Sequence, residues 1–174
     1  MPGHRVEAVA NAFLRRAMAD GVTLSNMQVQ KLPYIAQGWA LALLDRPLVA
    51  ETPVTFPFGP VYERLYNALR EYGAGPVRRL VREGDGIPAL YFDGPSGPVI
   101  DADFDAEEIG LIDAVWKAYK GFSALQLSAL THQAVLPRML VRDQAGARQP
   151  IPNEVIKAHY LALVAERKAA RAAA

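Results

Sequence analysis

The segment from residue 25 to residue 44 constrains the fold most, because it has the pattern of one long helix that is apolar almost all round near its end. Ser25 is followed three residues later by Gln28, a capping-box pattern that marks a helix start. Apolar residues then recur with a period of 3.6, at Leu32, Ile35, Ala36, Trp39, Ala40 and Leu43. Pro33 lies inside this helix, where its missing N–H predicts a kink. We therefore expect a helix that runs through the centre of the domain.

Further helices are indicated by apolar periodicity and by capping residues along the chain. They are expected over residues 6–20, 60–72, 105–120, 123–131 and 153–165. Pro60 suits the first turn of the second of these, because its missing N–H would have been unpaired anyway. Gly21 and Gly73 are expected to end the helices that precede them.

Residues 74–104 are irregular, with plausible short strands at 77–82 and 89–92 joined through Gly84-Asp85-Gly86. The predicted fold class is mainly α (α+β): a compact bundle of about six helices with a small β-hairpin or short antiparallel sheet. The sequence has no internal repeat and no linker, so residues 1–174 are expected to form a single domain. The basic, alanine-rich end at 167–174 is expected to fray.

Composition excludes several functional classes. The 174 residues contain no cysteine, which excludes disulfides and thiolate metal sites. No uninterrupted apolar stretch reaches the ~18 residues of a membrane span, and no signal peptide is evident, so a cytoplasmic protein is expected. The net charge of +1 gives no large electrostatic field to attract nucleic acid, so no nucleic-acid partner is expected. Arg78, Arg79 and Arg82 form a local basic cluster, which keeps a DNA-binding regulator of its own operon as one alternative.

One face of the predicted central helix carries Lys31, Tyr34 and Gly38 at positions i, i+3 and i+7. A small bare spot beside a cation and a phenol suggests that another backbone lies there. We therefore expect these residues, together with Gln37, to be exposed and to contact a partner protein. The alternative is that the stem of Lys31 covers apolar surface while Tyr34 is half buried.

A second candidate segment begins at Gly59-Pro60 and continues through Val61, Tyr62 and Tyr66. Free amides at the start of the helix could face a carbonyl or carboxylate of a partner. Gly-Pro also starts helices that have no such role, so both interpretations stay open at this point.

Aromatic side chains are the expected anchors of a protein interface, because tyrosine and tryptophan dominate interface hot spots. Tyr34, Tyr62 and Tyr66 are the candidates expected to be exposed. Trp39 and Trp116 are expected in the core.

Five segments taken in order carry a resemblance to a known family. They are NMQVQKLPYIAQGW at 26–39, FGPVY at 58–62, YG at 72–73, TH at 131–132 with Pro137, and PIPNEVI at 150–156. They resemble segments of the Panacea domain, a SocA-like family formerly known as an uncharacterised domain. Three positions depart from its pattern: Pro33 replaces an apolar residue, and Leu136 and Arg138 replace the usual serine and tryptophan.

The resemblance implies a bacterial or phage antitoxin that neutralises a cognate protein toxin. In the SocA type it also implies an ATP-dependent protease of the ClpXP kind as a partner that destroys the toxin. Trp39, Thr131, His132 and Pro137 are motif residues with structural roles under this interpretation. We expect a binding protein, with no enzyme activity and no cofactor, that recognises its toxin through the exposed side of helices 25–44 and 60–72.

A histidine-dependent enzyme centred on His132, with Asp103 or Asp105 nearby, is the other alternative. Histidine titrates near neutrality and can serve as an acid, a base or a ligand. However, His4, His132 and His159 lack the spacing of a zinc site, and no HExxH motif accompanies them. A threonine and a histidine that hold a helix end are the favoured interpretation of Thr131-His132.

Overall fold

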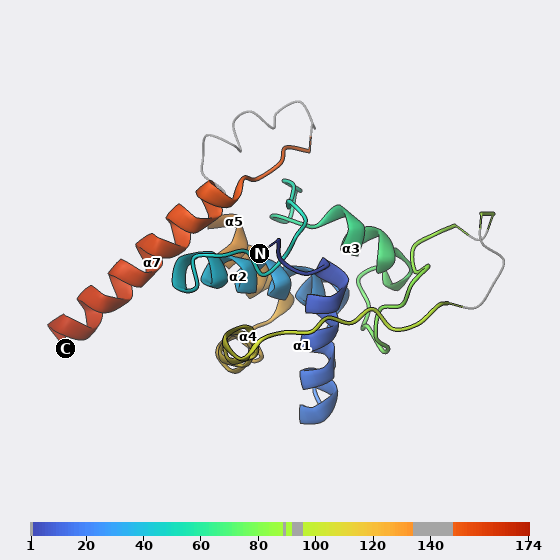
Figure 1. The fold of residues 1–174 in the computed structure, drawn as a ribbon, viewed down its shortest axis with the longest axis horizontal. Coiled ribbons are helices and arrows are strands. Elements are labelled where there is room, and N and C mark those ends of the chain that lie inside the picture. Colours follow the sequence, from blue (N-terminus) through green and yellow to red (C-terminus); the bar gives the residue numbers. More distant parts are fainter. Residues whose placement is uncertain (1, 89, 92–95, 134–147) are drawn as a thin grey trace.

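The computed structural model describes residues 2–88, 90–91, 96–133 and 148–174. Within them the fold is helical (Figure 1). Its elements in chain order are α1 (Val6–Asp20), α2 (Asn26–Leu43), α3 (Glu63–Ala68), the 3-10 turn η1 (Arg70–Tyr72), α4 (Ala106–Tyr119), α5 (Ala124–Gln133) and α7 (Asn153–Ala173). The prediction of a mainly α fold with about six helices is confirmed.

Helix α2 is the central element, as its sequence predicts. It packs against α1, α4, α5 and α7 (Figure 1). The capping box is present, because the Ser25 Oγ accepts the N–H of Gln28 while the Gln28 Oε1 accepts the N–H of Ser25. The helix continues through Pro33, and every residue from Val29 to Leu41 is buried.

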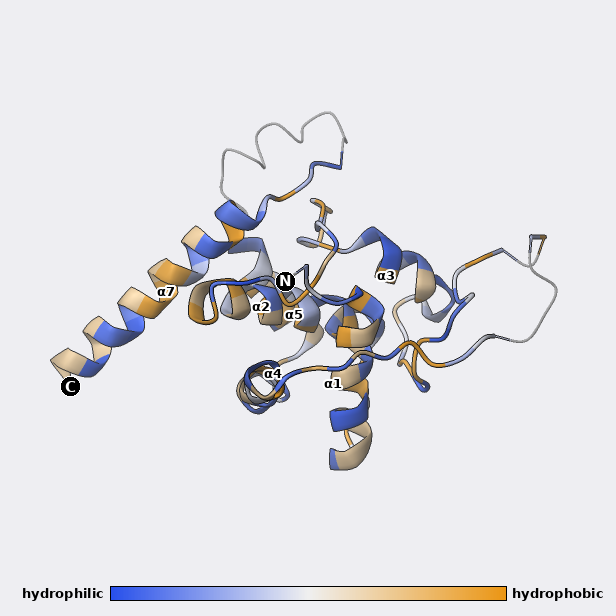
Figure 2. Ribbon diagram, viewed as in Figure 1, coloured by the Kyte–Doolittle hydropathy of each residue, from blue (hydrophilic) through white to orange (hydrophobic). Residues whose placement is uncertain are grey.

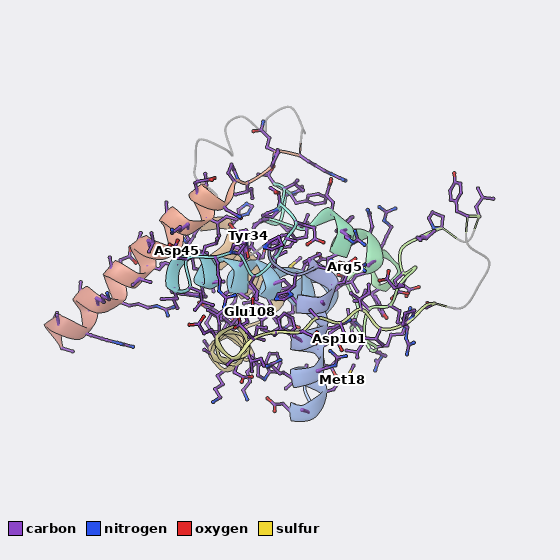
Figure 3. The ribbon with its side chains drawn as sticks, in the orientation of Figure 1. Arg5, Met18, Tyr34, Asp45, Asp101 and Glu108 are labelled. Carbon is purple, nitrogen blue, oxygen red and sulfur yellow. The ribbon has the colours of Figure 1, made fainter. Side chains whose placement is uncertain are left out.

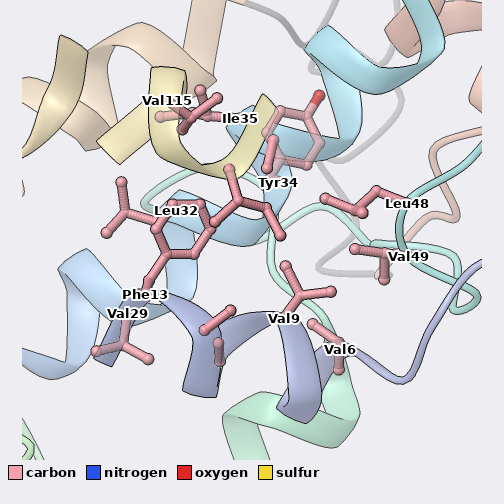
Figure 4. Close-up of a cluster of buried hydrophobic side chains, with 14 of the residues drawn as sticks. Val6, Val9, Phe13, Val29, Leu32, Tyr34, Ile35, Leu48, Val49 and Val115 are labelled. Carbon is pink, nitrogen blue, oxygen red and sulfur yellow. The ribbon is translucent and has the colours of Figure 1, made fainter. Parts of the chain in front are cut away.

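The core forms where α1 crosses α2. Val9 and Phe13 of α1 face Leu32 and Ile35 of α2, and Val115 of α4 closes the cluster (Figure 4). The buried cluster includes residues of all six α-helices, so one continuous core supports them. The outer helices carry both apolar and polar residues, and the two kinds recur turn by turn, which is clearest on α7 (Figure 2). Trp39 and Trp116 are buried, as predicted.

The predicted β-hairpin is wrong. No strand occurs in the described part of the chain, where pairing is limited to isolated bridges such as Arg82 with Val99. Residues 81–83 form backbone hydrogen bonds with residues 97–100. The Asn11 amide supports this pairing, since it bonds the N–H and C=O of Val81 and the C=O of Ile100. Residues 89 and 92 of the expected second strand lie outside the described residues.

The helix predicted over 60–72 begins three residues late. Val61 and Val54 exchange both backbone hydrogen bonds, which holds Val61 extended, and Tyr62 is extended as well. The helix therefore starts at Glu63, and Pro60 lies in the turn before it rather than in its first turn. Gly73 ends the segment after η1, as predicted, and Gly21 ends α1 in the left-handed conformation.

The C-terminal segment is helical through Ala173, so the end expected to fray continues α7 in this structure. The second half of α7 extends away from the other helices (Figure 1). The Arg167 guanidinium of this half lies 4.5 Å from the centroid of the Trp39 ring.

Candidate partner-binding site

Lys31 is buried, which contradicts the prediction that it is exposed. Its relative exposure is 1%, and its Nζ donates a hydrogen bond of 2.9 Å to the C=O of Pro60. Burial lowers the pKa of this lysine from 10.5 to about 8, because a desolvated ammonium is unfavourable. The side chain therefore ties α2 to the turn before α3 and does not face a partner.

Gly38 and Tyr34 are also covered by the molecule's own chain. A methyl group built on Gly38 would overlap the ring of Tyr160, which comes from α7. Tyr34 is fully buried at the centre of the fold (Figure 3), and burial raises its pKa. The bare spot inferred from the sequence is real, but a ring of the same protein fills it. The expectation of an exposed Lys31–Tyr34–Gly38 face is wrong.

Gln37 likewise has an internal role. Its Oε1 accepts the N–H groups of Leu48 and Val49, each at 2.8 Å, and its Nε2 donates to the Oδ1 of Asn153. This buried amide holds the loop after α2 and the start of α7 against α2. It satisfies backbone groups that burial would otherwise leave unpaired.

The Gly59-Pro60 turn meets the Thr131-His132 pair. Gly59 has φ = +100°, and a methyl group on it would lie 3.1 Å from both the Lys31 Nζ and the Thr131 Oγ1 and 3.4 Å from the His132 Nδ1. These residues come from three of the segments that carry the family resemblance. The structure thus joins them into one internal cluster that only a glycine permits at position 59.

Ser128 and Thr131 contribute hydroxyl groups to this cluster from the side of α5. The Thr131 hydroxyl donates to the carbonyls of Leu127 and Ser128, while the Ser128 hydroxyl donates to the C=O of Phe58 at 2.7 Å. The Thr131 hydroxyl is thus bonded within its own helix, whereas the buried Nδ1 of His132 has no hydrogen-bond partner among the described residues. Asp105 caps α4 and pairs with Arg46. Pro137 lies outside the described residues.

Tyr62 differs from its prediction as well, because it is fully buried. Among the three predicted tyrosine anchors, only Tyr66 is partly exposed. Tyr62 becomes internal because it precedes α3 in extended conformation, which turns its side chain toward the core instead of along the outer face of a helix.

An open apolar groove of about 360 Å³ lies beside the buried cluster. Its walls come from the start of α2, from residues 56–61, from α3 and from the start of α5. The apolar side chains that line it are Met27, Phe56, Phe58, Val61, Tyr66, Ala74, Ala124 and Leu125. Phe58 and Leu125 are 64% and 75% exposed, which is high for large apolar residues. This groove is the strongest candidate for a contact surface in the described residues.

Three predicted site residues line this groove: Lys31, Val61 and Tyr66. Sequence reasoning missed Phe58 and Leu125. A signal for Leu125 was present, because it is two residues from the buried Leu127, and side chains two apart cannot share a helix face. No comparable signal marks Phe58, whose exposure depends on the turn that Lys31 and Ser128 hold.

The electrostatics of the groove are one-sided. No aspartate or glutamate is among the described residues that line it, whereas Lys31 is. The Arg70 guanidinium lies 5.9 Å from the centroid of the Tyr66 ring, and that of Arg148 lies 4.5 Å from the centroid of the Phe56 ring. Arg148 also pairs with Glu63 at 2.9 Å, but no ion pair in the described part of the chain involves Arg70. Counting the described residues alone, the rim therefore carries positive charge at Arg70 that no carboxylate neutralises.

The described residues contain no cluster of three histidine, aspartate or glutamate side chains suited to a metal ion. None of the helices described is both long and apolar enough to cross a membrane.

Comparison with known proteins places the chain in a family. The family model described as "Antitoxin SocA-like, Panacea domain" matches residues 29–135, which is more than half of the chain. Antitoxin SocA of Caulobacter vibrioides is 28% identical over 139 residues, an alignment that covers 80% of this chain and 71% of the relative. No solved structure matches the chain. The matched region begins in the first turn of α2, extends past the last residue of α5 and contains the buried cluster, and the chain therefore belongs to the SocA-like antitoxins that share the Panacea domain.

Proposed function

We propose that this protein neutralises a cognate protein toxin by binding it directly, and that the apolar groove between α2, α3 and α5 is part of the contact surface. Membership of the antitoxin family supports the first statement. The single structural observation that supports the second is the exposure of Phe58 and Leu125, which both line the groove. Exposed apolar residues beside a cavity are typical of interaction sites.

The proposed contact surface differs in part from the partner-contacting residues that were expected from the sequence. Val61 and Tyr66 stay in it, since they line the groove, and Phe58, Leu125 and Met27 join them. The buried Lys31 contributes by holding the turn that carries Phe58, not by touching the toxin. A specific complex would bury about 1,200–2,000 Å² in total, so the groove would be the centre of a larger contact.

Co-expression tests this proposal. The genes that flank the gene for this protein would be sequenced, and any small neighbouring reading frame would be induced in a bacterial host with and without this protein. We expect growth arrest that this protein relieves, and co-purification of the two proteins. A neighbouring product that is harmless, or whose toxicity is unchanged by this protein, would contradict the proposed function.

We also propose a route by which the complex ends toxicity: presentation of the bound toxin to a ClpXP-type protease. The lifetime of the toxin separates this route from simple occlusion. If the route operates, the toxin half-life falls when this protein is present and recovers in a host that lacks the protease. An unchanged half-life together with restored growth would leave occlusion as the mechanism.

A further inference from the structure

We propose that the groove binds an acidic, apolar segment of the toxin, in which a bulky apolar side chain lies between Phe58 and Leu125 and a neighbouring carboxylate faces Arg70. This inference rests on the proposed function and adds the chemistry of the bound segment. It depends on two independent features of the groove, namely its apolar walls and the charge of its rim.

The walls determine the apolar part of the segment. The groove is lined by aromatic and aliphatic side chains of five separate segments, and its volume of about 360 Å³ can hold one large side chain or two small ones. Phe58 and Leu125 expose most of their side chains to water in the free protein. Covering them with an apolar side chain removes that surface from water, which favours binding by ~25 cal/mol per Å² of apolar area.

The rim determines the charge of the segment. Tyr66 and Phe56 lie against each other with ring centroids 5.0 Å apart, and each ring has an arginine beside it. The guanidinium of Arg70 donates to the Asn67 Oδ1 and has no carboxylate partner in the described residues. A carboxylate of the segment would give Arg70 that partner, whereas a lysine or arginine would meet like charge.

A polypeptide fits these features better than a nucleic acid does. The groove walls are almost entirely apolar. Among the described residues, two exposed arginines lie at the rim, Arg70 and Arg148, and Arg148 already pairs with Glu63. Nucleic-acid sites need several cations along the path of the phosphates. The geometry therefore favours a protein segment.

The first experiment selects peptides from a phage-displayed random library on the full-length protein and measures the binding of enriched peptides by fluorescence polarisation. We expect enriched sequences with a large apolar residue within a few positions of Asp or Glu. Leu125→Asp should weaken their binding at least about tenfold, as expected for a change at an interface anchor. The matched control is Ile109→Asp, which changes an exposed apolar residue of α4 outside the groove and should leave binding unchanged.

Charge reversal tests the role of Arg70. Arg70→Glu should weaken binding of the acidic peptides and should strengthen binding of the same peptides with Lys in place of the acid. The proposal is overturned if no peptide is enriched, if enriched peptides are basic or lack acidic residues, or if Leu125→Asp and Ile109→Asp behave alike. Circular dichroism spectra that match the unchanged protein would show that each variant is folded.

The toxin itself separates this inference from the proposed function. If the protein relieves toxicity and Leu125→Asp relieves it equally well, the proposed function stands and the groove inference fails. If no neighbouring toxin is neutralised but acidic apolar peptides bind at the groove, the proposed function fails and the chemistry of the groove stands.

Discussion

Replacing Lys31 by methionine should remove a pH dependence from the free energy of unfolding. This dependence arises because a titratable lysine is buried at the centre of the fold. The ammonium is 1% exposed, and its one hydrogen bond in the described residues goes to the C=O of Pro60. Burial lowers its pKa from 10.5 to about 8 in the folded state. Lys31→Met keeps a long unbranched side chain in the same space and removes the titrating group.

The direction in which the free energy of unfolding changes with pH follows from the number of protons that the folded and unfolded states bind. Below pH 8 both the folded and unfolded chains are protonated at Lys31, so the full cost of burying the charge is present. Between pH 8 and 10.5 the unfolded chain keeps the proton that the folded chain has released, so the free energy of unfolding rises with pH. With these two pKa values, Lys31 should add about 2 kcal/mol to the free energy of unfolding between pH 7 and pH 9.5.

Urea unfolding of both proteins at pH 7 and pH 9.5 measures this difference. The unchanged protein should gain about 2 kcal/mol more than Lys31→Met over that interval. The lost hydrogen bond to Pro60 lowers the stability of the variant at both pH values and therefore cancels. Working below pH 10 keeps the buried tyrosines, whose pKa values are raised, largely out of the comparison. If the two proteins differed by less than about 0.5 kcal/mol in this gain, the inference that folding desolvates the Lys31 ammonium would be refuted, because urea extrapolation resolves effects of that size.

Three further substitutions test the packing by urea unfolding. Gly38→Ala should destabilise the protein by about 2 kcal/mol or more, since its methyl group overlaps a buried ring; Gly110→Ala is its control, and should be stabilising by up to about 1 kcal/mol because nothing lies within 4 Å of the added methyl. Gly59→Ala should cost about 1–3 kcal/mol through its φ of +100°, and unchanged stability would contradict the turn geometry. Asn11→Ala should cost about 2–4 kcal/mol and speed amide exchange of Val81, because three hydrogen bonds to buried backbone groups are lost.

The helices could be predicted from the sequence because their signals are local. Capping boxes at Ser25 and Asp105 depend on residues three apart, and both are present in the structure. The 3.6-residue period of apolar side chains located the helices that build the core. The hairpin and the start of α3 were predicted wrongly because distant contacts decide them: Asn11 holds the expected strand, and Val54 holds Val61 extended.

The sequence alone determined that Lys31, Tyr34 and Gly38 form one surface of α2, because positions i, i+3 and i+7 share one helix face. It also indicated that another group covers this surface. Only the tertiary structure decided what covers it. The ring of Tyr160 fills the gap and the Gly59-Pro60 turn binds the amine, although both are far away along the chain. Helical spacing places side chains on a face but says nothing of which segment packs against that face. For the same reason the exposed groove at Phe58 and Leu125 became visible only once α2, α3 and α5 were assembled.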